Sequence, residues 1–264
     1  SQKRARIRVI LMHDIPDEDL LKFRNIINFL SKNWNFISAD EFANHLNGTN
    51  ELDGNNILLT FDDGFSSNRK VAEKILAPLG IKALFFVATG FIKAKNSEEH
   101  KKFILNSLYP KWRNHSLPSN INNMSGLTMN DLRFLVEEGH TIGCHTETHP
   151  DLSKIDNQNE LKSEIIDSGD FLERELNTKI KHFSFGFGNI KFFSEVALKV
   201  AMGRYPYIYT GMRGDNSQIK NCWAIRRDTI DLDDNLMMIG SFLEGLVDFR
   251  YKKAFEEYES WGLQ

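Results

Sequence analysis

Two adjacent aspartates, Asp62 and Asp63, have the residue type and the position of catalytic groups. They lie in the stretch Thr60-Phe-Asp-Asp-Gly64, directly after the apolar residues 57–59. An apolar run bounded by polar residues is typical of a buried strand, and α/β folds place catalytic groups at the carboxyl ends of such strands. Because successive side chains of an extended segment point in opposite directions, the two carboxylates are expected to have different neighbours. A surface Asp-Asp-Gly turn is the alternative interpretation.

Two histidines four residues apart, His145 and His149, lie in the stretch His145-Thr-Glu-Thr-His149-Pro150. Residues at this spacing share a face of a helix or of a loop with one helical turn. Two imidazoles on one face, together with a carboxylate from elsewhere in the chain, form a typical site for a divalent metal. The His-Glu-x-x-His order of metalloproteases is absent, and Glu147 is expected to point away from the shared face. A chance pair of histidines without a metal is the alternative.

Composition and charge exclude several classes of protein. Of the 264 residues, 41% are hydrophobic and 26% are charged, as in ordinary globular proteins. A net charge of −3 disfavours a nucleic-acid partner, which would require a basic surface. No apolar run reaches the roughly 20 residues that span a bilayer. We recognise no signal peptide and expect a cytoplasmic protein, or a periplasmic or extracellular one if the natural chain begins further upstream. Cys144 and Cys222 are too few for a disulfide framework and are expected to be buried thiols.

The chain alternates between strand-like and helix-like segments about seven times. Apolar runs and alternating patterns predict strands at residues 6–12, 35–38, 57–61, 82–88, 140–144, 180–185, 207–210 and 222–225. Helical spacing of apolar residues predicts helices at residues 17–31, 68–79, 129–138, 159–176, 192–202 and 234–261, and one that Ser38 caps. Such alternation is typical of one α/β barrel or doubly wound sheet with parallel strands.

One segment interrupts this alternation. Residues 93–126 are polar, contain two prolines and carry one apolar patch at residues 103–108. The segment is too long for a plain connection, so we expect an inserted lid or a small helical excursion that shapes the substrate groove.

Taken together, these stretches resemble the polysaccharide deacetylase family, also called carbohydrate esterase family 4. Residues 60–64 match its first motif, Thr-Phe-Asp-Asp-Gly, and residues 145–150 match its second, His-Ser/Thr-x-x-His-Pro. The segments between them are also similar: Ala83-Leu-Phe-Phe-Val87, Leu127-Thr128 and Gly139-His-Thr-Ile-Gly143. The resemblance covers residues 7–232, and it implies a deformed (β/α)7-type barrel of the TIM-like class, with residues 1–264 as a single domain.

The resemblance also implies an activity and its residues. A member of this family removes the acetyl group of an N-acetylated sugar by metal-dependent hydrolysis and releases acetate. Asp63, His145 and His149 would bind one divalent metal ion, and Asp62 would act as the general base. Zn²⁺ is the expected ion, although Co²⁺, Ni²⁺ and Fe²⁺ suit the same ligands. The expected partner is an N-acetylated carbohydrate, and the sequence does not indicate an oligomeric state.

The position of the general acid resembles that of the circularly permuted members, such as the poly-N-acetylglucosamine deacetylases. Many members of the family carry this acid as a histidine near the C-terminus, but no histidine follows His182 here. Instead, Val9-Ile-Leu-Met-His13-Asp14 is similar to the Tyr-His motif with which the permuted members begin, with Met12 in place of the tyrosine. His13 is therefore assigned as the acid that protonates the leaving amine. A histidine that merely caps a strand is the alternative.

The third motif of the family is altered. Permuted members have Phe-x-Tyr-Pro-Tyr/Phe-Gly, whereas this chain has Phe183-Ser-Phe-Gly-Phe-Gly188, with Gly186 in place of the proline. The resemblance assigns the backbone N–H of Phe187 as a donor to the oxyanion and places Phe185 and Phe187 at the substrate.

The partner that orients Asp62 is less direct to assign, because no arginine precedes the third motif. Arg227, in Ile225-Arg-Arg-Asp228, is the expected substitute, and it would take part in catalysis by orienting Asp62. A surface Arg-Arg pair is the alternative.

Two other functions stay open. One is the same chemistry on a small lipid- or nucleotide-linked sugar, or on a formyl group. The other is a catalytically impaired, carbohydrate-binding relic of the same fold. The altered third motif favours the relic, whereas retention of the metal-binding and acid–base residues argues against it.

Overall fold

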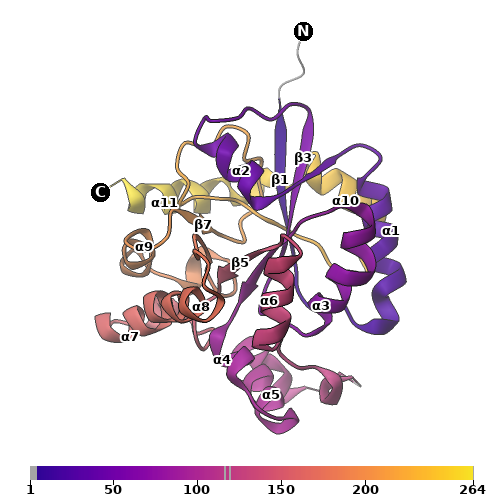
Figure 1. Cartoon of the computed structure of the whole chain (residues 1–264). Helices are drawn as coiled ribbons and strands as arrows, with labels where there is room; N and C mark the ends of the chain where they lie inside the picture. Colours follow the sequence, from indigo (N-terminus) through magenta and orange to yellow (C-terminus); the bar gives the residue numbers. More distant parts are fainter. Residues whose placement is uncertain (1–4, 116, 119, 264) are drawn as a thin grey trace.

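A curled parallel sheet forms the centre of the protein, and helices surround its outer face (Figure 1). The computed structural model describes residues 5–115, 117–118 and 120–263. Residues 1–4, 116, 119 and 264 of the predicted domain lie outside this description. The strand order is β7-β6-β5-β4-β3-β1-β8, with β2 also pairing with β3. The predicted α/β fold, a single domain with a deformed barrel, is therefore confirmed.

All the named strands pair in parallel. Their bounds are β1 Arg6–Met12, β2 Asn35–Ile37, β3 Asn55–Phe61, β4 Leu84–Val87, β5 Thr141–Cys144, β6 His182–Ser184, β7 Tyr207–Tyr209 and β8 Asp228–Thr229. The helices are α1 Leu20–Leu30, α2 Ala39–Leu46, α3 Ser67–Val71, α4 Thr89–Lys93, α5 Ser97–Phe103, α6 Met129–Glu137, α7 Gln158–Lys162, α8 Ser168–Leu176, α9 Glu195–Met202, α10 Leu236–Leu243 and α11 Lys252–Gly262. Three π-helical segments, Ala72–Leu76, Ile104–Leu108 and Ser163–Asp167, continue α3, α5 and α7.

The two faces of the sheet pack into separate cores because side chains alternate along each strand. Leu59 of β3 and Phe85 of β4 lie in the core between the sheet and the outer helices. Leu58 and Phe86, their neighbours in sequence, lie in the core inside the curl together with Phe42 of α2. A parallel sheet buried on both faces requires near-continuous apolar strands, which is the pattern that identified them in the sequence.

The C-terminal part differs from the prediction. The expected strand at residues 222–225 is represented by a single bridge, between Ile225 and Tyr209 of β7, and the next strand begins only at Asp228. This part of the chain crosses from β7 to β1 within a few residues, so its contact with each neighbour is short. The predicted helix at 234–261 is also interrupted between α10 and α11, where Gly245 has a φ of 90°.

A buried ion-pair group joins β1 to this C-terminal part. Arg8 of β1, which is 1% exposed, donates from Nε to Asp228 at 2.8 Å and from Nη1 to Asp248 at 2.8 Å. The group therefore fixes β8, the strand that follows Arg227, against the sheet.

Replacing Arg8 with methionine should lower the free energy of unfolding by about 3–5 kcal/mol, because it removes the closer partner of the buried Asp228 and leaves only Arg213, 3.5 Å away. The double variant Arg8→Met/Asp228→Leu should lose less, since no fully buried carboxylate is left at residue 228, and Asp248 and Arg213, which each lose a partner, are partly exposed. Urea denaturation of both variants measures the difference. Equal losses would contradict the view that the unpaired carboxylate is the main cost.

Among the described residues, no helix is long and apolar enough to cross a membrane. Cys144 is buried and Cys222 is partly buried, and both are free thiols.

Candidate active site

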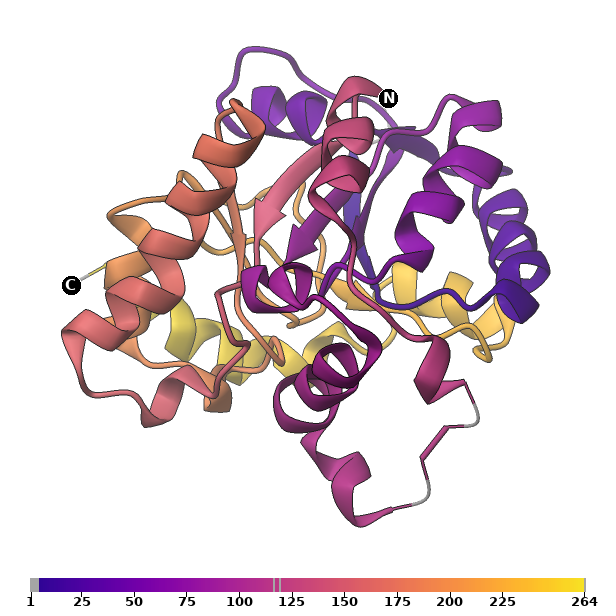
Figure 2. The same ribbon diagram turned by 60° about the horizontal axis from the view of Figure 1, so that its bottom comes forward.

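The predicted catalytic groups follow the carboxyl ends of neighbouring strands. His13 follows β1, Asp62 and Asp63 follow β3, and His145 follows β5. Because these strands are parallel, their ends meet at one edge of the sheet, which Figure 2 brings toward the viewer together with α5.

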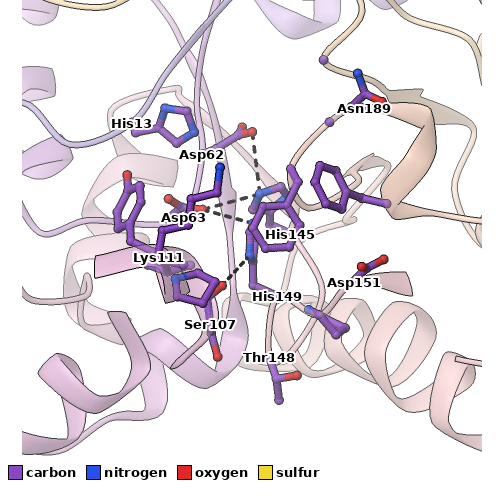
Figure 3. A pocket seen from close by; sticks show the side chains of 18 of the residues that line it. His13, Asp62, Asp63, Ser107, Lys111, His145, Thr148, His149, Asp151 and Asn189 are labelled. Carbon is purple, nitrogen blue, oxygen red and sulfur yellow. Dashed lines mark hydrogen bonds and ion pairs between the residues drawn. The ribbon is translucent and has the colours of Figure 1, made fainter. Parts of the chain in front are cut away.

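Asp63, His145 and His149 converge at this edge (Figure 3). Oδ1 of Asp63 lies 3.6 Å from Nε2 of His145 and 3.7 Å from Nε2 of His149. One ligand atom from each residue lies within 4.8 Å of the other two, and all three residues are buried. Three tetrahedral ligands about 2.0–2.1 Å from a zinc ion are about 3.3–3.4 Å apart, so these separations fit a divalent metal with a slight contraction.

The hydrogen bonds of the two imidazoles favour metal binding through Nε2. Nδ1 of His145 donates to the carbonyl of Ser184 at 2.8 Å, and Nδ1 of His149 donates to the carbonyl of Ser107 at 3.2 Å. A carbonyl only accepts, so each Nδ1 carries the hydrogen and each Nε2 presents its lone pair toward Asp63.

Burial also shifts the protonation of these groups. It lowers the pKa of His145, and it lowers the pKa of His149 to about 3, so both rings are neutral, as metal ligands must be. Burial and the neighbouring Asp62 raise the pKa of Asp63 well above its usual value. An ionised Asp63 therefore requires a cation beside it, and the donor set fits a divalent metal.

The loop between the histidines is not the helical turn that we predicted. Thr146 and His149 have positive φ angles of 67° and 55°, and no helix is assigned over this loop. The backbone N–H of His149 donates to Oγ1 of Thr146 at 3.0 Å. A tight, strained loop therefore brings the imidazoles together, and strain of this kind is concentrated at functional sites. The side chain of Glu147 pairs with Lys93 at 3.0 Å, away from the imidazoles.

Asp62 has a partner that Asp63 lacks, Arg227, although its Oδ2 also lies 3.7 Å from Nε2 of His145. Arg227 donates to both carboxylate oxygens of Asp62, at 2.7 and 2.8 Å, and both residues are buried. Arg227 also donates to Oγ of Ser184 at 2.5 Å and to the carbonyl of Thr210 at 2.9 Å. The alternative of a surface arginine pair is thus wrong for Arg227. Burial alone would raise the pKa of Asp62, but Arg227 and His145 outweigh it, so the pKa is lowered and the carboxylate is ionised.

His13 lines the same pocket, on the side of Asp62 (Figure 3). Its backbone carbonyl accepts a hydrogen bond from Nδ2 of Asn68 at 3.0 Å. Burial lowers the pKa of His13, and the nearby Asp62 opposes this shift. The ring thus lies at the pocket, and its role as the general acid stays a prediction.

A comparison of sequences decides the family. A search of curated proteins finds no significant match. The family model described as polysaccharide deacetylase matches residues 49–202, more than half of the 264 residues. The chain belongs to the polysaccharide deacetylase family. It is accordingly a hydrolase, a carbohydrate N-deacetylase.

Solved structures share the fold of this deacetylase. The Streptococcus pyogenes deacetylase PplD, in complex with acetate, has a TM-score of 0.69 at 19% identity, over 92% of this chain and 99% of that one. A de-N-acetylase from Aggregatibacter actinomycetemcomitans has a TM-score of 0.69 at 20% identity, over 90% of this chain and 99% of its own. IcaB from Ammonifex degensii has a TM-score of 0.68 at 18% identity, over 91% and 99% of the two chains.

Phe185 and Phe187 of the altered third motif lie in different surroundings in the deacetylase. Phe187 lines the pocket, is 38% exposed and packs its ring against His149, with ring centres 4.5 Å apart. Phe185 is fully buried and stacks on Phe193 at 4.1 Å. The prediction that Phe185 contacts the substrate is therefore wrong, because its ring belongs to the core.

Gly186, which stands in place of the proline of this motif, lies close to His149. A Cβ atom built on Gly186 would lie 3.1 Å from Nε2 of His149, which is tighter than an ordinary contact. Any larger residue at this position would press on the imidazole. Glycine therefore leaves room for His149 in the deacetylase site.

Residues of the insertion form one wall of the pocket. The sequence predicted that the insertion shapes the substrate groove, but not which of its residues line it. The pocket has a volume of about 850 Å³. Tyr109 and Trp112, whose rings stack 4.2 Å apart, line it. Lys111 lines it too (Figure 3). Phe187 and Phe192 line it as well, with ring centres 4.9 Å apart. Aromatic residues within a polar insertion were the signal in the sequence that could have identified this wall.

Proposed function

We propose that this deacetylase hydrolyses the N-acetyl group of a sugar within an oligosaccharide, polysaccharide or glycan precursor, and that it depends on one divalent metal ion, with Zn²⁺ as the expected ion. The observation that supports this proposal is the buried convergence of Asp63, His145 and His149 beside a second carboxylate, Asp62, that has its own partner. A divalent ion held by these three residues would lower the pKa of a water molecule and polarise the acetyl carbonyl.

Asp62 is the general base in this proposal. It takes a proton from the attacking water, and its lowered pKa keeps it ionised until then. Arg227 binds both of its oxygens, so it fixes the direction of the carboxylate and contributes the charge that stabilises the ionised form.

Phe187 acts on the carbonyl oxygen of the reacting amide, and His13 acts on its nitrogen. The backbone N–H of Phe187 makes no hydrogen bond within the described residues, so it is available to the oxyanion of the tetrahedral intermediate. His13 donates a proton to the departing amine, because an amide anion is too poor a leaving group to depart unprotonated.

Replacing His13 with alanine should reduce hydrolysis of an N-acetyl sugar by about 10²–10⁴-fold, the usual contribution of a general acid. Hydrolysis of an aryl acetate should fall much less, since a phenolate departs without a proton. Parallel rates of acetate release from a chitooligosaccharide and from an aryl acetate give the ratio. Equal losses on both substrates would contradict the acid role of His13.

Acetate release from chitooligosaccharides and from a small aryl acetate, with and without added Zn²⁺, tests the proposal as a whole. Zn²⁺-dependent release from the oligosaccharides is the expected result. Release from the small acetate alone would favour a small substrate. Tight sugar binding without release under any condition would favour the binding relic.

A further inference from the structure

We propose that Glu164 is a positioning residue that holds the loop of His145 and His149 in its metal-binding form before a metal arrives. Glu164 lies in the π-helical segment Ser163–Asp167, far from Asp63 in the sequence. The inference rests on the proposed metal site, but not on the catalytic steps that follow metal binding.

The carboxylate of Glu164 binds the loop at three points. Oε2 accepts hydrogen bonds from the backbone N–H of Glu147 at 3.0 Å and from that of Thr148 at 2.8 Å. Oε1 accepts a hydrogen bond from Oγ1 of Thr148 at 2.7 Å. Glu164 is only 8% exposed, so these bonds replace most of the hydration that its charge loses on burial. All three donors lie between the two histidines.

The loop requires such support because its backbone is strained. Thr146 has a φ of 67°, which is unusual for a β-branched residue, and His149 has a φ of 55°. Backbone angles of this kind cost free energy and persist only where the surrounding structure over-determines them. The two angles set the directions of the imidazoles, so contacts that hold the angles also hold the ligand atoms.

The start of α4 binds the carbonyl groups of the same loop. The N–H of Thr89 donates to the carbonyl of Thr146 at 3.1 Å, and the N–H of Gly90 donates to the carbonyl of Glu147 at 2.8 Å. The loop carbonyls thus bind α4, while its N–H groups bind Glu164. Without the carboxylate, two N–H groups of the loop would lose their acceptor, and the strained conformation would be held from one side only.

The helix that carries Glu164 is itself attached next to the first histidine. Oγ of Ser168 donates to the carbonyl of Glu164 at 2.6 Å and lies 3.1 Å from Sγ of Cys144, the residue before His145. One helical turn therefore contacts the chain before His145 and the loop after it. π-Helical segments frequently occur at functional sites, where the wider turn redirects a side chain or a carbonyl.

Glu164 is not a further metal ligand in this arrangement. Both of its oxygens are engaged by the loop, and the ligand group among the described residues consists of Asp63, His145 and His149. Its effect on the metal therefore passes through the backbone between the histidines. Changes to residues that orient metal ligands typically cost about 10–100-fold in affinity.

The variant Glu164→Gln tests this role, because it keeps the size of the side chain and removes its charge and one acceptor oxygen. We expect it to bind Zn²⁺ or Co²⁺ about 10–100-fold more weakly, measured by competition with a chelator of known affinity. At saturating metal, kcat should stay within a few-fold of the wild type. Glu160→Gln is the matched control, since Glu160 is an exposed acid on the same helix, one turn earlier. It should leave metal affinity unchanged.

A second variant keeps the test informative if Glu164→Gln folds poorly. Thr148→Ala removes the hydroxyl donor and keeps both N–H bonds, so it should weaken metal binding by only a few-fold. In the double variant the two effects should not add, because both act on one contact. A lower melting temperature with unchanged metal affinity in Glu164→Gln would overturn the proposal. A wild-type protein that binds metal but releases no acetate would refute the proposed function alone.

Discussion

Replacing His149 with alanine should empty the metal site and abolish acetate release together. The variant leaves Asp63 and His145, only two of the three residues whose ligand atoms converge. The loss in metal affinity should exceed the 10–100-fold that is typical of residues that merely orient a ligand. Without the metal, Asp62 faces an ordinary water molecule with a pKa near 15.7, which a carboxylate cannot deprotonate effectively.

Metal content after dialysis and the rate of acetate release measure this result. His115→Ala is the control, since His115 is an exposed imidazole that does not line the pocket. It should keep the metal and the activity. If His149→Ala retained one metal ion per chain, the assignment of the two histidines as ligands would be wrong.

The convergence of these ligands could be predicted from the sequence because of the parallel sheet. A polar residue follows each of the apolar segments that become β1, β3 and β5, and parallel strands place such ends at one edge. The family motifs then distinguished Asp62 from Asp63. The buried pair of Asp62 with Arg227 followed from the same reasoning, although β8 itself begins later than expected.

The loop conformations could not be predicted in the same way. The resemblance placed both Phe185 and Phe187 at the substrate, and two such side chains would face the same side if the strand predicted at residues 180–185 continued through Phe187. However, β6 ends at Ser184, and Phe187 has a φ of 59°, so the chain turns and the two rings diverge. Sequence patterns assume regular backbone angles, and strained positions are where that assumption fails.

Glu164 was missed for another reason. It lies within a segment predicted as one amphipathic helix, residues 159–176, where acidic residues normally face solvent. Only the approach of the loop after β5 gives its carboxylate three donors. A contact between a helix and a distant loop leaves no periodic signal in the sequence, so such a residue is found from the structure alone.

Whereas His149→Ala should lose both metal and activity, the variant Asp62→Asn should keep the metal and lose turnover. Both oxygens of Asp62 bind Arg227, and the ligand group contains Asp63 instead, so the metal does not require Asp62. An amide at this position cannot take a proton from water, and the loss of a general base typically reduces kcat by about 10²–10⁴-fold.

Stability must be separated from catalysis in this variant, because the buried Arg227 loses its anionic partner at a cost of about 3–5 kcal/mol. The double variant Asp62→Asn/Arg227→Gln removes the unpaired charge, so it should recover part of the stability and none of the activity. Metal content, kcat and the melting temperature of both variants distinguish the two effects. Loss of the metal from folded Asp62→Asn would show that Asp62 is a ligand, and the two aspartates would then have to exchange roles.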